Sequence, residues 1–262
     1  MKTIVITLVL FITLSHNLSG RTAIPYQTTV DVIVNEQEEP GIQSRIMTAF
    51  LNSFVIQNNS EMIALIDELS SMYDKSHNSL FLYWKGYALY YNSIIYLKNG
   101  DKNKAHEELN KGIDALEAIK AKNSEDYALL SMLHSFSCQF LKFPKVVSAS
   151  RNADKCIEKA LKLDENNPRV YYVLANNDYY TPETYGGGSN VEENALKSLS
   201  LPVQEINNPY LPSWGRQECY ELLTNYYIKK NMMDKAKVYI ELGLAEYPDS
   251  YTLKYNKSKL PL

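Results

Sequence analysis

Three parts of this chain repeat one pattern of small and apolar residues, and this repetition limits the possible folds more than any other feature. In each copy a small residue is followed by small or apolar residues at the same offsets, which is the spacing of one face of a helix. The three copies are Ala105, Leu109, Gly112 and Ile113; Ala153, Ile157, Ala160 and Leu161; and Ala236, Ile240, Gly243 and Leu244. The repetition predicts a chain built from similar helical units.

Each copy also has turn residues where the helical pattern stops. Asn99, Gly100 and Asp101 precede the first copy, and Pro168 follows the second, where it suits the first turn of a new helix. Two helices cross closely only where a small side chain replaces a bulky one, so we expect Ala and Gly at the crossing points of helical hairpins. A single hairpin leaves an apolar face bare, so several must stack. We therefore predict an all-α solenoid of antiparallel helical hairpins, with room for five or six hairpins and a short closing segment at 251–262.

Composition agrees with long helices packed through aromatic contacts. The 262 residues include only 10 Gly and 10 Pro but 21 Tyr. The formal charge is -3, from 27 basic and 30 acidic residues, so the chain has no broad basic surface for a phosphate backbone. We therefore expect no nucleic-acid partner.

The N-terminus has the layout of a secretory signal. Lys2 is followed by an apolar run from Ile4 to Leu14, and then by polar and small residues up to Gly20. The run is far shorter than the roughly 20 residues that a bilayer requires. We interpret 1–20 as a signal peptide, 21–40 as an extended leader arm and 41–262 as the helical repeat domain. The mature protein is then expected to be periplasmic or secreted, with no transmembrane span.

The repeated units resemble the tetratricopeptide-repeat (TPR) superfamily. More narrowly, three stretches are similar to exported bacterial TPR proteins akin to the TRAP-transporter T component: Asn167-Pro168-Arg169, Pro182 to Gly188, and Trp214-Gly215. This resemblance implies a non-catalytic helical scaffold that acts outside the cytoplasm, beside a transporter or an envelope complex. Asp178 departs from the pattern, because it stands where the repeat usually has an aromatic residue.

The chain has only weak matches to phosphate-binding, metal-binding and catalytic motifs. The run Gly186 to Gly188 could form a phosphate loop, but it follows a helical stretch rather than a strand, and Asn190 with Glu193 has the spacing of a capping box. A structural turn is the favoured reading. His106 precedes two glutamates, yet a zincin motif needs a second His where the chain has Asn110. We therefore expect no metal, no cofactor and no enzymatic activity.

Three cysteines at wide spacing do not make a disulfide framework. We expect Cys138, Cys156 and Cys219 to be buried thiols, since cysteine often serves as a small core residue.

The repeat frame leaves one face of three helices pointing into a concave groove, and these faces are the candidate binding site. Residues three and four apart share a helix face. The groove candidates are Arg169, Tyr172, Asn176 and Tyr179 on the helix from Pro168; Glu218, Glu221, Asn225 and Ile228 on the helix near Trp214; and Tyr83, Tyr87, Tyr90 and Ile94 on the helix before Gly100. Tyrosine offers an apolar ring and a polar tip, which suits a peptide, a glycan or an organic acid. The alternative is that these rings pack between hairpins.

The leading functional hypothesis is an exported scaffold that binds a protein or peptide partner through its concave groove. The second is a periplasmic receptor for a small molecule or glycan associated with a transporter, and the third is an unrecognised enzyme. A closed pocket lined by Tyr172, Asn176 and Tyr179 favours the receptor, whereas an open groove favours a polypeptide.

Overall fold

A computed structural model of the chain describes residues 41–56, 58–202 and 208–260, all of whose regular structure is helical. The predicted signal peptide and leader arm lie outside these residues. The helices are α1 (Ile42–Ile56), α2 (Ser60–Ser76), α3 (Ser79–Lys98), α4 (Lys102–Glu117), α5 (Ser124–Ser137), α6 (Lys145–Leu163), α7 (Pro168–Tyr180), α8 (Val191–Ser200), α9 (Arg216–Lys229), α10 (Met233–Glu246) and α11 (Tyr251–Lys259). Two short 3₁₀ turns, η1 (Cys138–Phe140) and η2 (Glu183–Tyr185), follow α5 and α7. The all-α prediction is confirmed.

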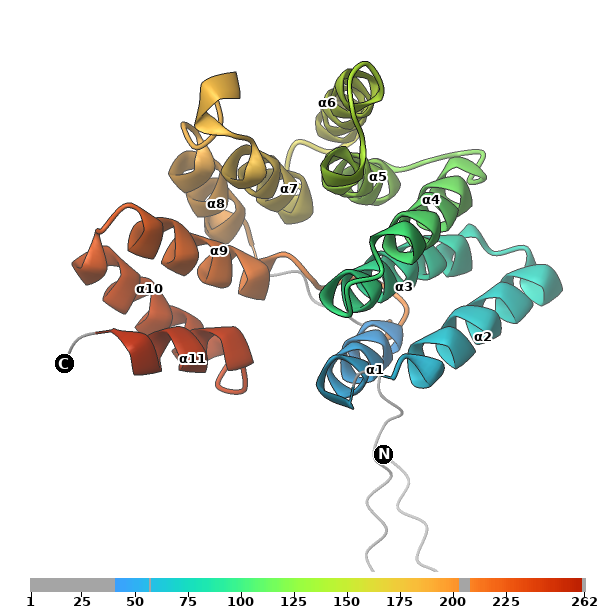
Figure 1. Cartoon of the computed structure of the whole chain (residues 1–262), viewed down its shortest axis with the longest axis horizontal. Coiled ribbons are helices and arrows are strands. Elements are labelled where there is room, and N and C mark those ends of the chain that lie inside the picture. The colour runs from blue at the N-terminus through green and yellow to red at the C-terminus, as the bar shows by residue number, and fades with distance from the viewer. Residues whose placement is uncertain (1–40, 57, 203–207, 261–262) are drawn as a thin grey trace, which may run out of the picture. The chain divides into compact units, whose positions relative to one another are not determined.

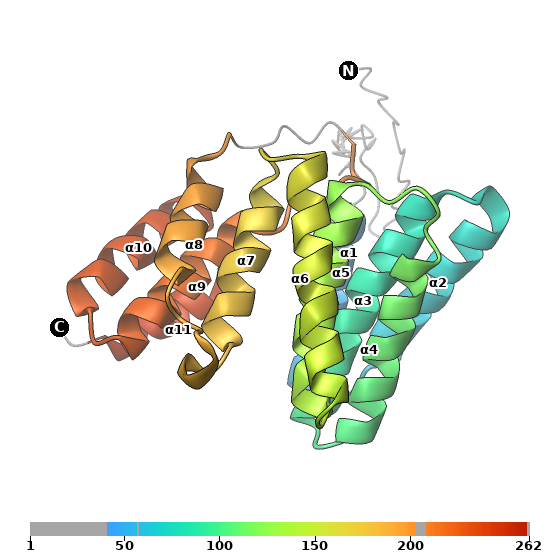
Figure 2. The same ribbon diagram turned by 90° about the horizontal axis from the view of Figure 1, so that it is seen from above.

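Successive helices pack as antiparallel pairs: α1 with α2, α3 with α4, α5 with α6, α7 with α8, and α9 with α10, closed by α11. The first helix of each pair also contacts the first helix of the next, in the series α1, α3, α5, α7, α9 and α11. Within residues 41–260 these first helices form an inner layer, and α4, α6 and α8 lie outside it (Figure 1). The pairs follow one another in chain order (Figure 2). The predicted solenoid of hairpins is therefore confirmed.

Small residues lie where paired helices cross, as expected. A Cβ atom built on Gly86 of α3 would lie 2.9 Å from Cγ of Leu116, and one on Gly112 of α4 would lie 3.2 Å from the carbonyl oxygen of Gly86. Ala153 and Ala236 are buried in the same way on α6 and α10. Any larger side chain at these positions would separate the two helices of a pair.

The helix ends follow local capping chemistry. The side chain of Asp101 accepts a hydrogen bond from the amide of Lys104 and starts α4. Asn167 caps α7 by accepting from the amide of Arg169, with Pro168 in the first turn. The predicted turn at 99–101 and the predicted helix start at Pro168 are confirmed.

One connection departs from simple hairpin stacking. Residues 208–214, here called the return segment, lie against α1 and α3 before α9 begins. The indole Nε1 of Trp84 donates to the carbonyl oxygen of Tyr210 at 2.7 Å, and Nε1 of Trp214 donates to Tyr83 Oη at 2.7 Å. Oε1 of Gln43 on α1 accepts from the amide of Trp214 at 3.0 Å. Trp214 is thereby buried in the core of the first helical pairs, about 130 residues away in sequence.

Candidate functional site

Five half-buried side chains on the inner layer lie close enough to affect one another's charge: Tyr90 and Tyr91 from α3, Tyr172 from α7, and Glu218 and Glu221 from α9. We call them the tyrosine–glutamate cluster. They come from three helices that are far apart in the sequence, and each keeps part of its surface accessible. The packing of the inner helices, not local sequence, brings them together.

The tyrosines of α3 belong to a continuous row of half-buried rings. The ring of Tyr91 lies 4.7 Å from Phe50 of α1 and 5.2 Å from Tyr90, measured between centroids. The ring of Tyr90 lies 5.0 Å from Phe136 of α5. The row therefore crosses three successive inner helices. Its aromatic surface is longer than a ligand with a single small ring would contact.

Trp214 joins this row to α7. Its ring stacks on Tyr87 at 5.7 Å and meets Tyr172 edge-on at 5.8 Å. Gly215, the next residue, packs against Tyr172, because a Cβ atom built on the glycine would lie 3.8 Å from Tyr172 Cβ. The return segment therefore places the start of α9, and with it Glu218, beside Tyr172.

Glu218 is held by the backbone at the start of α9. Its Oε2 accepts a hydrogen bond from the amide of Gly215 at 2.6 Å. Burial, and then the charge of Glu221, raise the pKa of Glu218 to about 7. Hydrogen bonds from the backbone amides of Glu218 and Gly215, and the charge of Arg169, act in the opposite direction. After burial itself, the negative charge of Glu218 helps to raise the pKa of Tyr91 and Tyr172. The carboxyl and the phenols therefore share one electrostatic environment.

Glu221 lies one turn further along α9 and accepts two hydrogen bonds. The donors are Nε2 of Gln217 at 3.0 Å and Oγ of Ser250 at 2.7 Å. These bonds fix the orientation of the carboxylate, since Ser250 also caps the neighbouring helix α11.

Three of the predicted groove residues are buried instead. Tyr83 and Tyr87 are each 1% exposed, because the return segment with Trp214 covers this side of α3. Arg169 is 3% exposed and forms a bidentate ion pair with Glu125 of α5. These positions are corrections to the expected groove: they support the inner layer from within and offer no surface to a partner.

The other predicted residues remain half-buried. Tyr90, Tyr172 and Glu221 are brought together in the cluster. Asn176 lies on α7, one turn beyond Tyr172. Two further candidates make contacts within the inner layer: the ring of Tyr179 lies 5.2 Å from Nζ of Lys229, and Oδ1 of Asn225 accepts from Asn256 of α11 at 2.8 Å. Tyr179 and Asn225 therefore take part in packing between inner helices, and the groove formed by the remaining residues stays a prediction.

Sequence reasoning missed Tyr91 and Phe136. Tyr91 lies four residues after Tyr87, so the four-residue spacing on α3 could have indicated it. Phe136 sits at the end of α5, and only the contact between α3 and α5 reveals its role.

The glycine-rich turn is structural. Oδ1 of Asp178 accepts from the amide of Gly188 at 3.1 Å, and Oδ2 accepts from the amide of Asn190 at 2.6 Å. These bonds occupy amides that a phosphate would need. The predicted capping box is wrong, because the side chain of Asn190 makes no capping bond at the start of α8. Asp178 takes part of that role by accepting the hydrogen bond from the amide of Asn190.

Side chains with potential for metal or thiol chemistry are dispersed. In the described part of the chain, no three His, Cys, Asp or Glu side chains are grouped to hold a metal ion. The ring of His106 stacks on Phe140 at 5.2 Å. The cysteines are free thiols; Cys156 and Cys219 are buried, while Cys138 is only half-buried. Burial raises the pKa of the Cys156 thiol to about 11.

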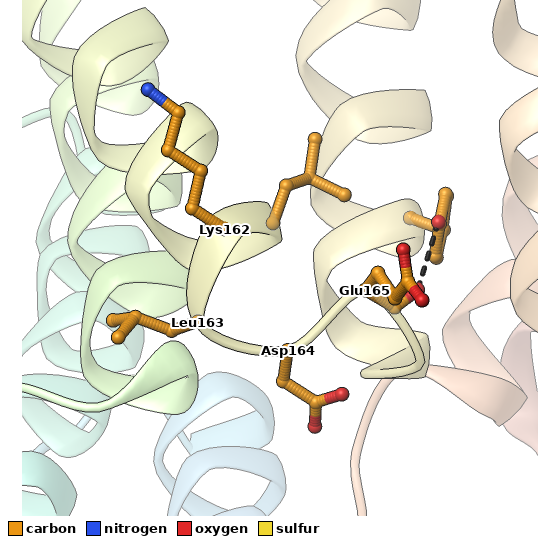
Figure 3. A pocket seen from close by; sticks show the side chains of 6 residues that line it. Lys162, Leu163, Asp164 and Glu165 are labelled. Carbon is orange, nitrogen blue, oxygen red and sulfur yellow. Dashed lines mark hydrogen bonds between the residues drawn. The ribbon is translucent and has the colours of Figure 1, made fainter.

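Two surface hollows lie away from the cluster. One of about 670 Å³ is at the connection between α6 and α7, where the side chains of Lys162, Leu163 and Asp164 point in different directions (Figure 3). The other, of about 310 Å³, lies between α1 and α2. At the first hollow no set of polar groups converges on one point, so it has the character of a surface depression. None of the helices described is both long and apolar enough to cross a membrane.

Comparisons with known proteins give a likeness in structure. No family model matches the chain, and no curated protein matches it. Among solved structures, the HusA haemophore from Porphyromonas gingivalis is similar with a TM-score of 0.51 and 20% identity, over 74% of this chain and 96% of that one. Lower TM-scores are found for Nro1, described as a nuclear import adaptor (0.39, 12% identity, 82% of this chain and 76% of that one), and for Acl4, an assembly chaperone of RpL4 (0.30, 14% identity, 85% and 94%). The likeness to the haemophore shows the fold, and the chain is accordingly an all-α helical-repeat protein.

Proposed function

We propose that this chain is an exported, non-catalytic binding scaffold that holds a protein or peptide partner against the tyrosine–glutamate cluster. The observation that carries the proposal is the row of half-buried rings from Phe50 through Tyr91 and Tyr90 to Phe136. It extends across α1, α3 and α5, and the buried rings of Tyr87 and Trp214 link it to Tyr172. Half-buried aromatic rings with polar tips are typical of protein recognition surfaces, and a row across several helices suits an extended partner.

A receptor for a small molecule or glycan, associated with a transporter, is the second candidate. The observation that favours it is the fold shared with a protein described as a haemophore. Such a ligand would bind to the same rings, so the two candidate functions differ in the bound molecule and share the binding site.

Photo-cross-linking in the organism of origin tests the first candidate. Tyr180 ends α7 and is 71% exposed. It lies near Tyr90, because after burial itself the charge of Tyr180 helps to raise the pKa of Tyr90. We place p-benzoylphenylalanine at Tyr180 and, as a matched control, at Val238, which is 50% exposed on α10. A discrete polypeptide adduct at position 180 that is absent at position 238 supports the scaffold.

The same preparation tests the second candidate. If the chain is a receptor, native mass spectrometry of the purified protein should show a bound small molecule that is lost in Tyr172→Ala. No polypeptide adduct should form at position 180. Equal adducts at both positions, or neither an adduct nor a bound molecule, would contradict both candidates.

A further inference from the structure

The two carboxylates of the cluster have one cation near them, Arg169, whose charge favours the ionised form of Glu218. Glu218 and Glu221 are three residues apart on one face of α9, and neither takes part in a salt bridge among the residues described. The charge of each opposes that of the other, since Glu221 raises the pKa of Glu218. Arg169, the nearby cation on α7, forms its bidentate ion pair with Glu125. The cluster as a whole is therefore acidic.

The rings beside these carboxylates can also attract a positive charge. The face of a tyrosine ring carries partial negative charge, and a guanidinium or ammonium group over it is stabilised by a cation–π interaction. The side chains of Tyr90 and Tyr172 are both half-buried. A group that enters here therefore meets ring faces, phenol oxygens and two carboxylates, all of which favour a cationic donor.

From this charge complementarity we propose that the partner presents a basic side chain, arginine above all, to the tyrosine rings and the two carboxylates of the tyrosine–glutamate cluster. The inference rests on the proposed function and specifies its partner. Arginine fits better than lysine, because its planar guanidinium can stack on a ring and donate two hydrogen bonds to a carboxylate at once. An acidic partner segment would be repelled by Glu218 and Glu221, because the nearby Arg169 is already paired with Glu125.

Selection of peptides from a random phage-displayed library tests the inference on the intact protein. Selection runs at pH 8, because the raised pKa of Glu218 leaves it partly protonated at pH 7. Bound peptides are expected to carry arginine or lysine. Replacing that arginine by neutral citrulline in a synthetic copy should weaken binding by about tenfold or more, since a charge-assisted hydrogen bond is lost.

Variants of the protein separate site-specific attraction from general charge. Glu218→Gln with Glu221→Gln should also weaken binding of the selected peptide by about tenfold or more. Gln at 218 can still accept from the Gly215 amide, so α9 keeps its cap. The control, Glu158→Gln with Glu241→Gln, makes the same change in net charge at exposed positions on α6 and α10 and should leave binding unchanged.

Three outcomes would count against the account, and they differ in what they overturn. Selected peptides without basic residues that still lose binding in Tyr172→Ala would overturn the basic-group inference and leave the binding scaffold standing. Equal loss in the control variant would also overturn the inference, because it would show attraction to overall charge. Binding that is independent of Tyr172 would overturn the proposed function itself.

Discussion

Replacing Gly243 by leucine should destabilise the C-terminal pairs by a predictable amount. A Cβ atom at this position of α10 would lie 2.6 Å from Leu253 Cδ1 and 2.9 Å from Tyr220 Cβ. Leu253 could rotate away, but Tyr220 Cβ is fixed to the backbone of α9, so the two helices must separate. Overpacking of this kind costs up to about 3 kcal/mol, and the better helix propensity of leucine returns about 1 kcal/mol. The net loss in free energy of unfolding is then about 2 kcal/mol, or about 4–8 °C in melting temperature.

Urea denaturation followed by circular dichroism measures this loss. Ala245→Leu is the matched control, because Ala245 is exposed on the same helix and its substitution adds the same type of side chain without a crossing partner. The control should differ from the wild type by less than about 0.5 kcal/mol. An unchanged stability for Gly243→Leu would refute the reasoning that small residues set the distance between paired helices.

Three further predictions concern other parts of the chain. The pKa of Glu218 is about 7 in the folded protein and 4.5 in its ordinary state, so between these pH values the folded protein holds a proton that the unfolded chain has released. The free energy of unfolding should therefore fall as the pH rises from 4.5 to 7. Urea denaturation at several pH values should find a smaller fall in Glu218→Gln. An equal slope in both proteins would contradict the raised pKa. Arg169→Met should cost about 3 kcal/mol by leaving Glu125 without its partner, and adding Glu125→Leu should recover part of that loss in the same assay; a loss below about 1 kcal/mol would show that the pair is not buried in solution. Intact mass measurement of the exported protein should show the loss of roughly the first 20 residues, and recovery of the full-length mass from the cytoplasm would contradict the predicted signal.

Much of the fold could be predicted because its determinants are local. Helix crossings are indicated by small size alone, as at Gly112, Ala153 and Ala236. Helix starts are indicated by side chains that hydrogen-bond within a few residues, as at Asp101 and Asn167. Such signals depend on spacing along the chain, which a sequence displays directly.

The candidate binding face could be predicted only in part, because long-range packing decides which side of α3 is covered. Tyr83 and Tyr87 were placed on the correct helix, but the covering group is Trp214 of the return segment. Helix periodicity predicts which rings share one face of a helix. It does not predict that a segment distant in sequence covers some of them. Arg169 was missed as a buried residue for the same reason, since its partner Glu125 lies 44 residues away.

Hydrogen exchange of the protein with and without a selected basic peptide tests the central claim most directly. The claim is that the inner layer, at the tyrosine–glutamate cluster, binds the partner. We expect slower exchange in the peptides that cover Tyr90 of α3, Tyr172 of α7 and Glu218 of α9, with no change in α4, α6 and α8. Slower exchange confined to these outer helices, or to the hollow between α6 and α7, would contradict it.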